Sequence, residues 1–215
     1  MTKITFDITT SLDGYVAGPN QSVDEPLGEG GEALHEWAFA LEAWRKPHGR
    51  EGGETTASSA LMEEGLARTG AVVMGRKMFG GGGTGPWGDE PWEGWWGDDP
   101  PFHVPVFVVT HHPREKLEKE GGTTFTFVTD GIKAAVEQAR SAAGGKDVSI
   151  GGGADVIQQA LRAGLVDEFQ VNVAPVLLGS GTSLFGEVGT GELAVEPTGV
   201  VEAPAVTHLR YRVVK

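Results

Sequence analysis

The chain has 215 residues, of which 39% are hydrophobic and 22% charged, a composition typical of a folded globular protein rather than a disordered one. The absence of cysteine excludes disulfides, iron–sulfur clusters and thiol nucleophiles. The formal charge of −13 disfavours nucleic acid and anionic membranes as partners, because both are bound through clustered Lys and Arg.

Three features bear on the compartment and the domain organisation. Asp7 interrupts the apolar residues near the N-terminus, so a secretory signal peptide is not expected. No stretch approaches the roughly 20 apolar residues that a membrane helix needs. Neither an internal repeat nor a linker divides the chain, so we expect a single domain over residues 1–215 in the cytoplasm.

The N-terminal part begins with a strand and continues with two helices. Residues 3–10 alternate apolar and polar side chains, as a half-buried strand does, and a turn-rich loop follows over 11–20. The spacing of apolar residues predicts a helix over 32–44, followed by a polar loop over 45–53. A second, weaker helix is predicted over 58–68.

Short apolar runs in the middle of the chain predict strands that are buried on both faces, as a parallel sheet requires. These runs are 71–74, 104–110, 124–128 and 148–150. Asp130 occupies an N-cap position before a helix that extends to about residue 143.

The C-terminal part contains one helix and two strands. The helix follows Gly153, and Gly164 is expected to end it as the residue after the C-cap. Strands are predicted over 168–173 and 208–214. Because strands and helices alternate along most of the chain, the pattern predicts an α/β sheet with crossover connections.

Residues 80–103 are unusual in composition, with eight Gly, four of the six Trp and five acidic residues. A loop of this length without secondary structure is uncommon unless it has a function. Its many Trp residues predict that it packs on another part of the protein, as a lid over a site or as part of a dimer contact.

A glycine run is the first candidate for a ligand site. Ile150, Gly151, Gly152 and Gly153 connect a strand directly to a helix. Glycines permit close approach of a ligand to the backbone, and the free N–H groups and the dipole of a helix N-terminus favour pyrophosphate. The spacing is not the G-x-G-x-x-G of a dinucleotide fold, and a tight turn that serves only packing explains it equally well.

Two cationic segments follow other predicted strands. Arg76 and Lys77, within residues 74–79, come after the run 71–74, where α/β sheets bind ligands; taken alone, they read more simply as solvated surface cations. Thr110, His111 and Arg114 close the next strand and could meet an adenosine 2′-phosphate. We expect no metal here, because adjacent histidines rarely converge on one ion.

The remaining candidates are Asp13 and Trp37. Asp13 follows a strand end and could orient a substrate or be a simple turn aspartate. Trp37 suits the core better than a ligand-binding wall. There is no Ser–His–Asp pattern with a nucleophile elbow, so a hydrolase has little support.

In this order, the segments resemble the dihydrofolate reductase-like superfamily. The resemblance is greatest to the C-terminal reductase domain of the bifunctional deaminase-reductases of bacterial riboflavin biosynthesis, of which this chain looks like a stand-alone member. The resemblance spans almost the whole chain, and the matching stretches are 11–17, 73–79, 106–111, 150–153 and 167–181.

The resemblance implies a three-layer αβα sandwich with a mostly parallel central sheet and an antiparallel C-terminal edge. It also implies NADPH as the cofactor and a homodimer. Met78 departs from the family's Gly-Arg-x-Thr segment, so one hydroxyl that would contact phosphate is missing. The implied cofactor-binding residues are Ala17, Gly75, Arg76, Lys77, Met78, Thr110, His111, Arg114, Ile150, Gly151, Gly152, Gly153, Ala154 and Val156.

The resemblance also suggests what lies at the substrate end. Asp13 matches a residue near the nicotinamide and is the candidate proton donor, with water as the alternative. Trp37 and Trp87 are also expected to contact the substrate, although the segment 80–103 that contains Trp87 is not part of the family pattern. Dihydrofolate reductases carry a pterin-binding carboxylate on their first long helix. None of the acidic residues of the predicted first helix is an assured equivalent, and no basic pocket for a ribose phosphate is evident.

These observations predict an NADPH-dependent reductase that transfers hydride to a small heterocyclic or ribosylamino-type substrate. Two alternatives remain. One is a non-catalytic NADP(H)-binding or ligand-sensing module on the same fold. The other is a structural dimer whose glycines serve only packing.

Overall fold

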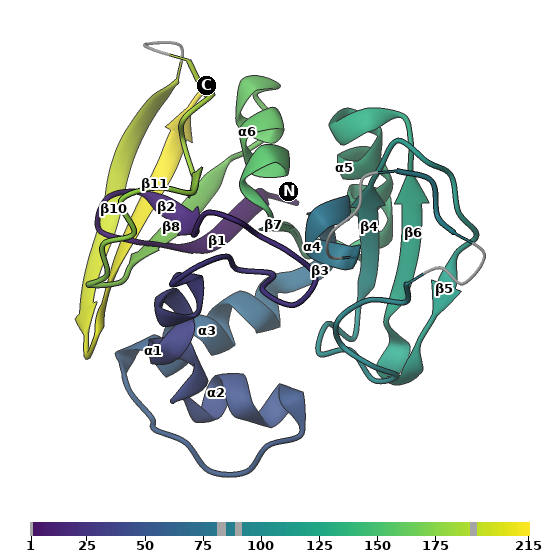
Figure 1. The fold of residues 1–215 in the computed structure, drawn as a ribbon. Helices are drawn as coiled ribbons and strands as arrows, with labels where there is room; N and C mark the ends of the chain where they lie inside the picture. The colour runs from purple at the N-terminus through teal and green to yellow at the C-terminus, as the bar shows by residue number, and fades with distance from the viewer. Residues whose placement is uncertain (1, 81–84, 89–91, 190–192) are drawn as a thin grey trace.

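A nine-stranded sheet forms the centre of the protein (Figure 1). The computed structural model describes residues 2–80, 85–88, 92–189 and 193–215. The order of strands in the sheet is β10-β11-β8-β1-β7-β3-β4-β6-β5, and β2 pairs separately with β9. The strands are β1 (Ile4–Thr10), β2 (Tyr15–Ala17), β3 (Thr69–Gly75), β4 (Pro105–Val109), β5 (Leu117–Glu118), β6 (Thr124–Val128), β7 (Asp147–Gly152), β8 (Glu168–Val173), β9 (Thr182–Ser183), β10 (Ala194–Ala203) and β11 (Val206–Val214).

Strand direction divides the sheet into a parallel centre and antiparallel edges. β8, β1, β7, β3, β4 and β6 are parallel neighbours, while β11 runs antiparallel to both β8 and β10. The predicted α/β class and antiparallel C-terminal edge are therefore confirmed. A second antiparallel edge, formed by β5, was not predicted.

Helices cover both faces of the sheet (Figure 1). α5 and α6 lie on one face, and α1, α2 and α3 lie on the other. No helix in the described part of the chain is long and apolar enough to cross a membrane. The helices are η1 (Gly31–His35), α1 (Glu36–Phe39), α2 (Glu42–Arg45), η2 (Lys46–His48), α3 (Ala57–Arg68), α4 (Arg76–Gly80), η3 (Glu120–Gly122), α5 (Gly131–Ala142) and α6 (Ala154–Arg162).

The single helix predicted over 32–44 is wrong. The segment breaks into η1, α1 and α2, and Leu41 is extended, with φ −80° and ψ 139°. The backbone N–H of Glu54 donates to the carbonyl of Ala40 over 2.8 Å, and that of Glu42 donates to Glu54 over 3.0 Å. The returning loop thus supplies strand-like partners at the break, a tertiary contact that helical periodicity cannot report.

Local signals located the other helix ends with mixed success. Gly164, at φ 66°, ends α6 as predicted, and the N–H groups of Gly164 and Leu165 donate back to Leu161 and Ala160. α3 begins one residue earlier than predicted, because Thr56 forms a capping box with Ser59. Asp130 does precede α5, but its side chain makes no capping hydrogen bond.

Four strands were not predicted: β2, β5, β9 and β10. The first three have only two or three residues. β10 is an edge strand in which most residues are exposed, so it lacks the apolar alternation that would reveal it.

Described residues of the tryptophan-rich segment cover the sheet face over β4 and β6. Trp87 packs edge-on against Phe79, and Trp96 stacks on Phe125, with ring centroids 6.0 and 6.2 Å apart. Phe79 and Phe125 are fully buried. The prediction that the segment packs on the protein is supported for these residues, while residues 81–84 and 89–91 lie outside the described part.

Replacing Trp96 by Ala is expected to lower the free energy of unfolding by about 2 kcal/mol, because a half-buried indole is removed from an aromatic cluster. Urea denaturation followed by circular dichroism would measure the change. Trp92→Ala is the matched control, since that side chain is 42% exposed, and its effect should stay within about 0.5 kcal/mol. Equal effects of the two substitutions would contradict the assigned packing.

Candidate active site

The two glycine-containing segments predicted to bind the cofactor meet at one edge of the sheet. β3 and β7 are parallel neighbours, so their carboxyl ends lie together. A Cβ atom added to Gly75 would lie 2.9 Å from Cγ2 of Val156 and 3.7 Å from the backbone of Gly152 and Gly153. Glycine is therefore required at position 75 for the end of β3 to approach the start of α6.

The loop from Gly151 to Gly153 leads directly into the nine-residue helix α6. Gly153 is the N-cap residue and supplies no side-chain cap, so the first N–H groups of α6 are available to a ligand. A Cβ on Gly153 would meet nothing within 4 Å, whereas Gly152 has a φ of 126° that side chains rarely adopt. The space beside Gly153 and the helix dipole suit a pyrophosphate.

Met78 packs against this loop from α4. A Cβ on Gly152 would lie 3.4 Å from the Met78 sulfur, and one on Gly151 would lie 3.6 Å from its terminal methyl group. The residue that departs from the family pattern therefore lies beside the glycine loop. It offers the loop an apolar thioether in place of a hydroxyl donor.

The cationic residues divide into stacked arginines and exposed side chains. The Arg76 guanidinium carbon lies 3.0 Å from the centre of the Trp87 ring, and that of Arg114 lies 4.8 Å from it. Burial, and secondarily the charge of Arg114, lower the pKa of Arg76. Two neighbouring cations on one indole favour a bound anion. Lys77 and His111 are exposed at the same edge.

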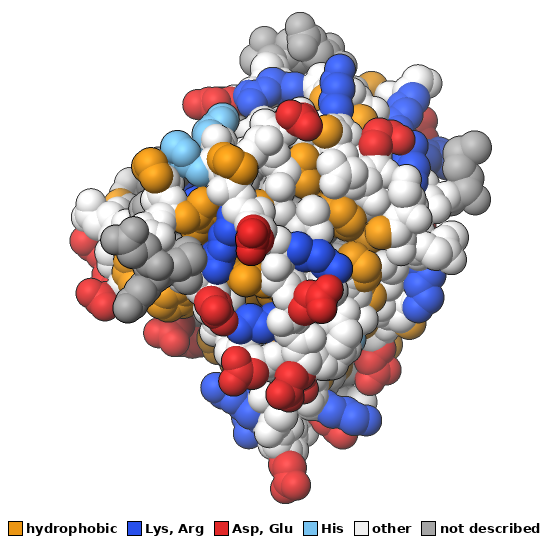
Figure 2. All heavy atoms as spheres, turned by 90° about the vertical axis from the view of Figure 1, so that its right-hand side faces the viewer, with side chains coloured by type: hydrophobic (Ala, Val, Ile, Leu, Met, Phe, Trp, Pro, Cys, Tyr) orange, Lys and Arg blue, Asp and Glu red, His pale blue; other side chains and the backbone are white. Residues whose placement is uncertain are grey.

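Basic and acidic side chains are interspersed on the face of the molecule shown in Figure 2. Phosphate binding by this acidic protein would therefore have to depend on local groups such as the stacked arginines rather than on the overall charge.

Thr110 is buried, and its hydroxyl is engaged by the chain itself. It accepts from the backbone N–H of His112 over 3.2 Å and donates to the carbonyl of the same residue over 3.4 Å. Thr110 therefore shapes the turn after β4 that presents His111. Its predicted contact with the cofactor stays a prediction, as does that of Ala17 on β2.

Asp13 joins two loops. Its carboxylate oxygens accept the backbone N–H groups of Leu178, over 3.2 Å, and Gly179, over 2.7 Å. A hydrogen bond from Ser11, and then these backbone bonds, lower its pKa. The carboxyl group is exposed and ionised at neutral pH, which suits a loop-orienting role better than the predicted role of proton donor.

A cavity of about 690 Å³ lies between the sheet and the helices α1 to α3. Trp37, His35 and Phe102 are among its aromatic lining residues, while Thr9 and Gly151 line it near the glycine loop. Trp37 also packs edge-on against His208, with ring centroids 5.3 Å apart. The position of Trp37 is consistent with the predicted substrate contact.

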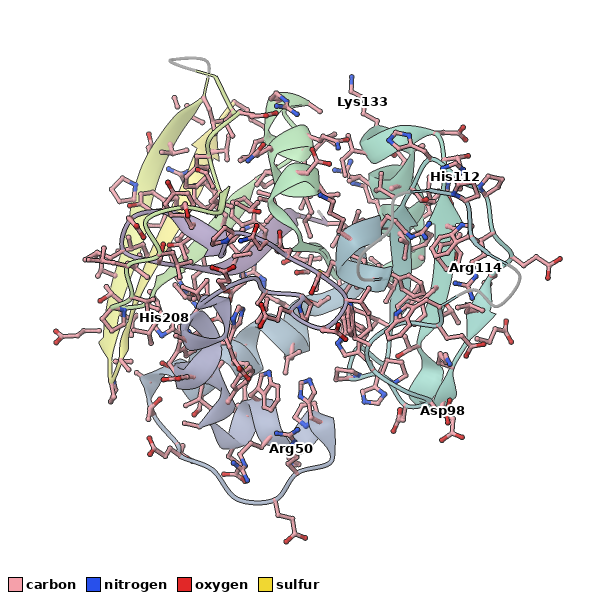
Figure 3. The ribbon with its side chains drawn as sticks, viewed as in Figure 1. Arg50, Asp98, His112, Arg114, Lys133 and His208 are labelled. Atoms are coloured by element: carbon pink, nitrogen blue, oxygen red, sulfur yellow. The ribbon has the colours of Figure 1, made fainter. Side chains whose placement is uncertain are left out.

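Trp87 lies elsewhere and does not line this cavity. Its indole N–H donates to the carbonyl of His112 over 2.9 Å, and its ring adjoins Arg114. Figure 3 places His112 and Arg114 beside β4 and β6, across the molecule from His208. The structure therefore separates the two tryptophans that were predicted to contact one substrate and places Trp87 against Arg76 and Arg114.

A polar network on the cavity side of β1, β8 and β11 was not anticipated from the sequence. Asp7 lies opposite Gln170, which lies opposite Arg210, and the next row consists of Thr9, Asn172 and His208. Side chains directly opposite on neighbouring strands lie within contact distance.

Asp7 is at the centre of this network. Gln170 donates to one carboxylate oxygen over 2.9 Å, and Asn172 donates to the other over 2.6 Å. The Asp7 side chain is exposed to the cavity, and partial desolvation by the protein around the cavity raises its pKa to about 6.

One sequence signal could have revealed these residues. Asp7 occupies a polar position in the alternating strand 3–10, and Gln170 and Asn172 occupy alternate positions in 168–173. Their placement on one face follows from the period of a strand, but the pairing of the two strands does not.

Comparison with known proteins relates the chain to the RibD C-terminal domain family. The sequence model of the RibD C-terminal domain matches residues 2–209. The uncharacterised protein YyaP of Bacillus subtilis (strain 168) is 24% identical over 190 residues, which cover 86% of this chain and 81% of that protein.

Solved structures share the fold. One is from Shewanella sp. PV-4, is described as a riboflavin biosynthesis protein, and has a TM-score of 0.62 at 22% identity with full coverage of both chains. Another, from Thermotoga maritima, is a diaminohydroxyphosphoribosylaminopyrimidine deaminase/5-amino-6-(5-phosphoribosylamino)uracil reductase, with a TM-score of 0.57 at 12% identity. The match covers 99% of this chain and 57% of that longer protein.

The raised pKa of Asp7 predicts a characteristic pH dependence of stability. The stabilising contribution of Asp7 is complete below pH 3.8, the pKa of an Asp side chain in the unfolded chain, and it is lost as the pH rises through about 6. The Tm of the wild type, relative to Asp7→Asn, should therefore increase as the pH is lowered from 7 to 4.

Asp13→Asn provides a control of opposite sign. Because the pKa of Asp13 is lowered, its contribution to stability is present above pH 3.8 and is lost as the pH falls below that value. Differential scanning calorimetry of the three proteins from pH 7 to well below 3.8 would measure both effects, because the Asp13 contribution changes only below 3.8. A Tm difference between wild type and Asp7→Asn that is independent of pH would contradict the assigned environment of Asp7.

Proposed function

Because the chain belongs to the RibD C-terminal domain family, we propose that it is an NADPH-dependent reductase that transfers hydride to a small heterocyclic or ribosylamino-type substrate. The observation that carries this proposal is the contact between Gly75 and the start of α6 beside an aromatic cavity. In α/β sheets, ligands bind beyond the carboxyl ends of the parallel strands.

The pyrophosphate of the cofactor would be held by the N–H groups at Gly153 and Ala154, with Gly151 and Gly152 allowing its approach. Met78 and Val156 would support this loop from below. Bound NADPH would supply the hydride, while the protein supplies position and electrostatics.

A preference for NADPH over NADH would come from the cations at the ends of β3 and β4. The charges of Arg76 and Arg114 are held together by Trp87, and Lys77 and His111 are exposed beside them. A 2′-phosphate would relieve the repulsion between the two guanidinium groups.

The substrate would enter the cavity beside Trp37, with Asp13 orienting the loops at the edge. The Thermotoga maritima relative suggests 5-amino-6-(5-phosphoribosylamino)uracil as the first substrate to test, and dihydrofolate is the second. The homodimer and the cytoplasmic location expected from the sequence stay predictions.

The overall test is to mix the protein with NADPH and each of these compounds and to follow the absorbance of the reduced nicotinamide. Oxidation of NADPH with formation of the reduced compound is expected for one of them. Tight binding of NADPH without oxidation by a panel of pterins, flavins and ribosylaminopyrimidines would favour the non-catalytic module, and no binding would exclude both functions.

Gly153→Asp tests the pyrophosphate site without damaging the fold. The position has open space and an ordinary φ of −73°, and Asp is a good N-cap residue, so stability should be kept or raised. The added carboxylate should repel phosphate and weaken NADPH binding by about 100-fold, measured by quenching of Trp fluorescence.

Gly153→Asn is the matched control, because it adds a cap of the same shape without the charge. Its NADPH affinity should fall much less than that of Gly153→Asp. Equal affinities for the wild type and both variants would show that the loop does not hold the pyrophosphate.

Arg76→Gln tests the nucleotide preference. Loss of a charge-assisted contact to the 2′-phosphate should weaken NADPH binding by about 10-fold and leave NADH binding almost unchanged. Calorimetric titration with both nucleotides would measure this. Equal losses for NADPH and NADH would instead assign Arg76 a general structural role.

A further inference from the structure

Asp7 is an acidic side chain that faces the cavity from the middle of the sheet. It lies in the cavity lined by Trp37 and by Gly151 of the glycine loop, so a substrate held there would meet its carboxyl group. We propose that Asp7 is the catalytic acid, donating the proton that the substrate heteroatom requires when hydride reaches the adjacent carbon. This inference rests on the proposed reductase function.

Arg210 sets the direction of the hydrogen bonds around Asp7. Its guanidinium can only donate, so the side-chain oxygen of Gln170, 2.9 Å away, accepts. The amide nitrogen of Gln170 therefore donates, both to Asp7 and to Oδ1 of Asn172, each over 2.9 Å. Because Oδ1 of Asn172 is an acceptor, its amide nitrogen is the donor to Asp7. Both carboxylate oxygens of Asp7 thus accept hydrogen bonds, and the positive charge of Arg210 determines that Gln170 and Asn172 are the donors.

His208 and Ser58 extend the network beneath α3 and hold Asn172 in this orientation. Oδ1 of Asn172 accepts, so Nδ1 of His208, 2.6 Å away, carries a proton. In the neutral ring Nε2 then accepts from the Ser58 hydroxyl over 2.8 Å. Burial and the charge of Arg210 lower the pKa of His208 and favour this neutral form.

The network leaves a defined place for a proton on Asp7. Each carboxylate oxygen offers two lone-pair directions, and one on each is filled by an amide N–H. A proton bound by Asp7 must occupy a remaining position, since the network side presents only donors. Asp7 lines the cavity, so the free positions are the ones available to a substrate.

The proton transfer balances with the hydride transfer. The carbon of a C=N or C=O bond in the substrate would receive the hydride that bound NADPH supplies, and the nicotinamide would be oxidised. The electron pair of the π bond moves to the nitrogen or oxygen, which forms a bond to the Asp7 proton as the carboxyl O–H bond breaks. The resulting carboxylate is stabilised by Gln170 and Asn172 and regains a proton from solvent in the cavity.

The surroundings of Asp7 suit an acid that works near neutral pH. Although the side chain is exposed to the cavity, desolvation by the surrounding protein raises its pKa to about 6, against the opposing effects of the Asn172 hydrogen bond and the charges of Arg210 and Arg68. The other charged or titratable side chains that line the cavity are Lys3, His35, Glu64, Glu168, His208 and Tyr211. By contrast, both oxygens of Asp13 accept backbone N–H groups, and its pKa is lowered.

The test is single-turnover oxidation of NADPH by the full chain with 5-amino-6-(5-phosphoribosylamino)uracil between pH 5 and 8.5. The wild-type rate should fall as the pH rises, with a midpoint near 6. Asp7→Asn should lower the rate at pH 6 by about 100-fold and remove this midpoint. Asp13→Asn should keep the midpoint, whatever its effect on the rate.

Asn172→Ala adds a second readout, the midpoint of the pH–rate profile, which would not change if Asp7 had a purely structural role. Loss of its hydrogen bond should raise the pKa of Asp7 and shift the midpoint above 6. Carbon-13 NMR of the Asp carboxyl groups provides an independent measurement: a signal that titrates near pH 6 should be absent in Asp7→Asn. NADPH affinity and circular dichroism would establish that each variant is folded.

The outcomes separate this proposal from the proposed function. An active wild type whose rate and pH profile are shared by Asp7→Asn would overturn the role of Asp7 and leave the reductase function intact. A wild type that binds NADPH but reduces neither this compound nor dihydrofolate would overturn the reductase function, and the acid role with it. Retention of the midpoint in Asp7→Asn and its loss in Asp13→Asn would transfer the acid role to Asp13.

Discussion

The pairing register of β1, β8 and β11 is the constraint on which the candidate site depends. It places Asp7, Gln170 and Arg210 in one row across the sheet. Because side chains alternate between faces, a slip of one residue in β1 would turn Asp7 away from the cavity. The register is held by the apolar partners on the opposite face, where Phe6 stacks on Phe169 with ring centroids 4.7 Å apart. The hydrophobic core and the polar network therefore specify the same alignment.

The parallel centre of the sheet connects this network with the cofactor side. β3, β7 and β1 run in the same direction and end at the same edge, where Gly75 and the glycine loop approach one another. Gly151 and Thr9 both line the cavity. A nicotinamide bound along that edge would therefore face a substrate from the glycine side, with the Asp7 carboxyl group also lining the cavity.

The tryptophan-rich segment both packs on the sheet and positions two arginine side chains. Its rings cover the face of β4 and β6 that lies opposite α5, so it contributes to the core. Trp87 is also the surface on which Arg76 and Arg114 rest. Without this indole the two guanidinium groups would have to be placed by their own flexible side chains. Part of the proposed phosphate site thus depends on a segment whose composition predicts that it packs on the protein.

The sequence by itself determined the α/β class and the glycines at strand ends, and it predicted the cofactor segments, because strand periodicity, apolar runs and glycine runs are local properties. The ordered motifs then related the chain to a family. Only the tertiary structure decided that the helix over 32–44 breaks at Leu41, that Trp37 and Trp87 lie apart, and that Asp7 rather than Asp13 faces the cavity within a polar network. Each of these depends on which distant segments become neighbours, and strand order and register are set by packing of the whole chain.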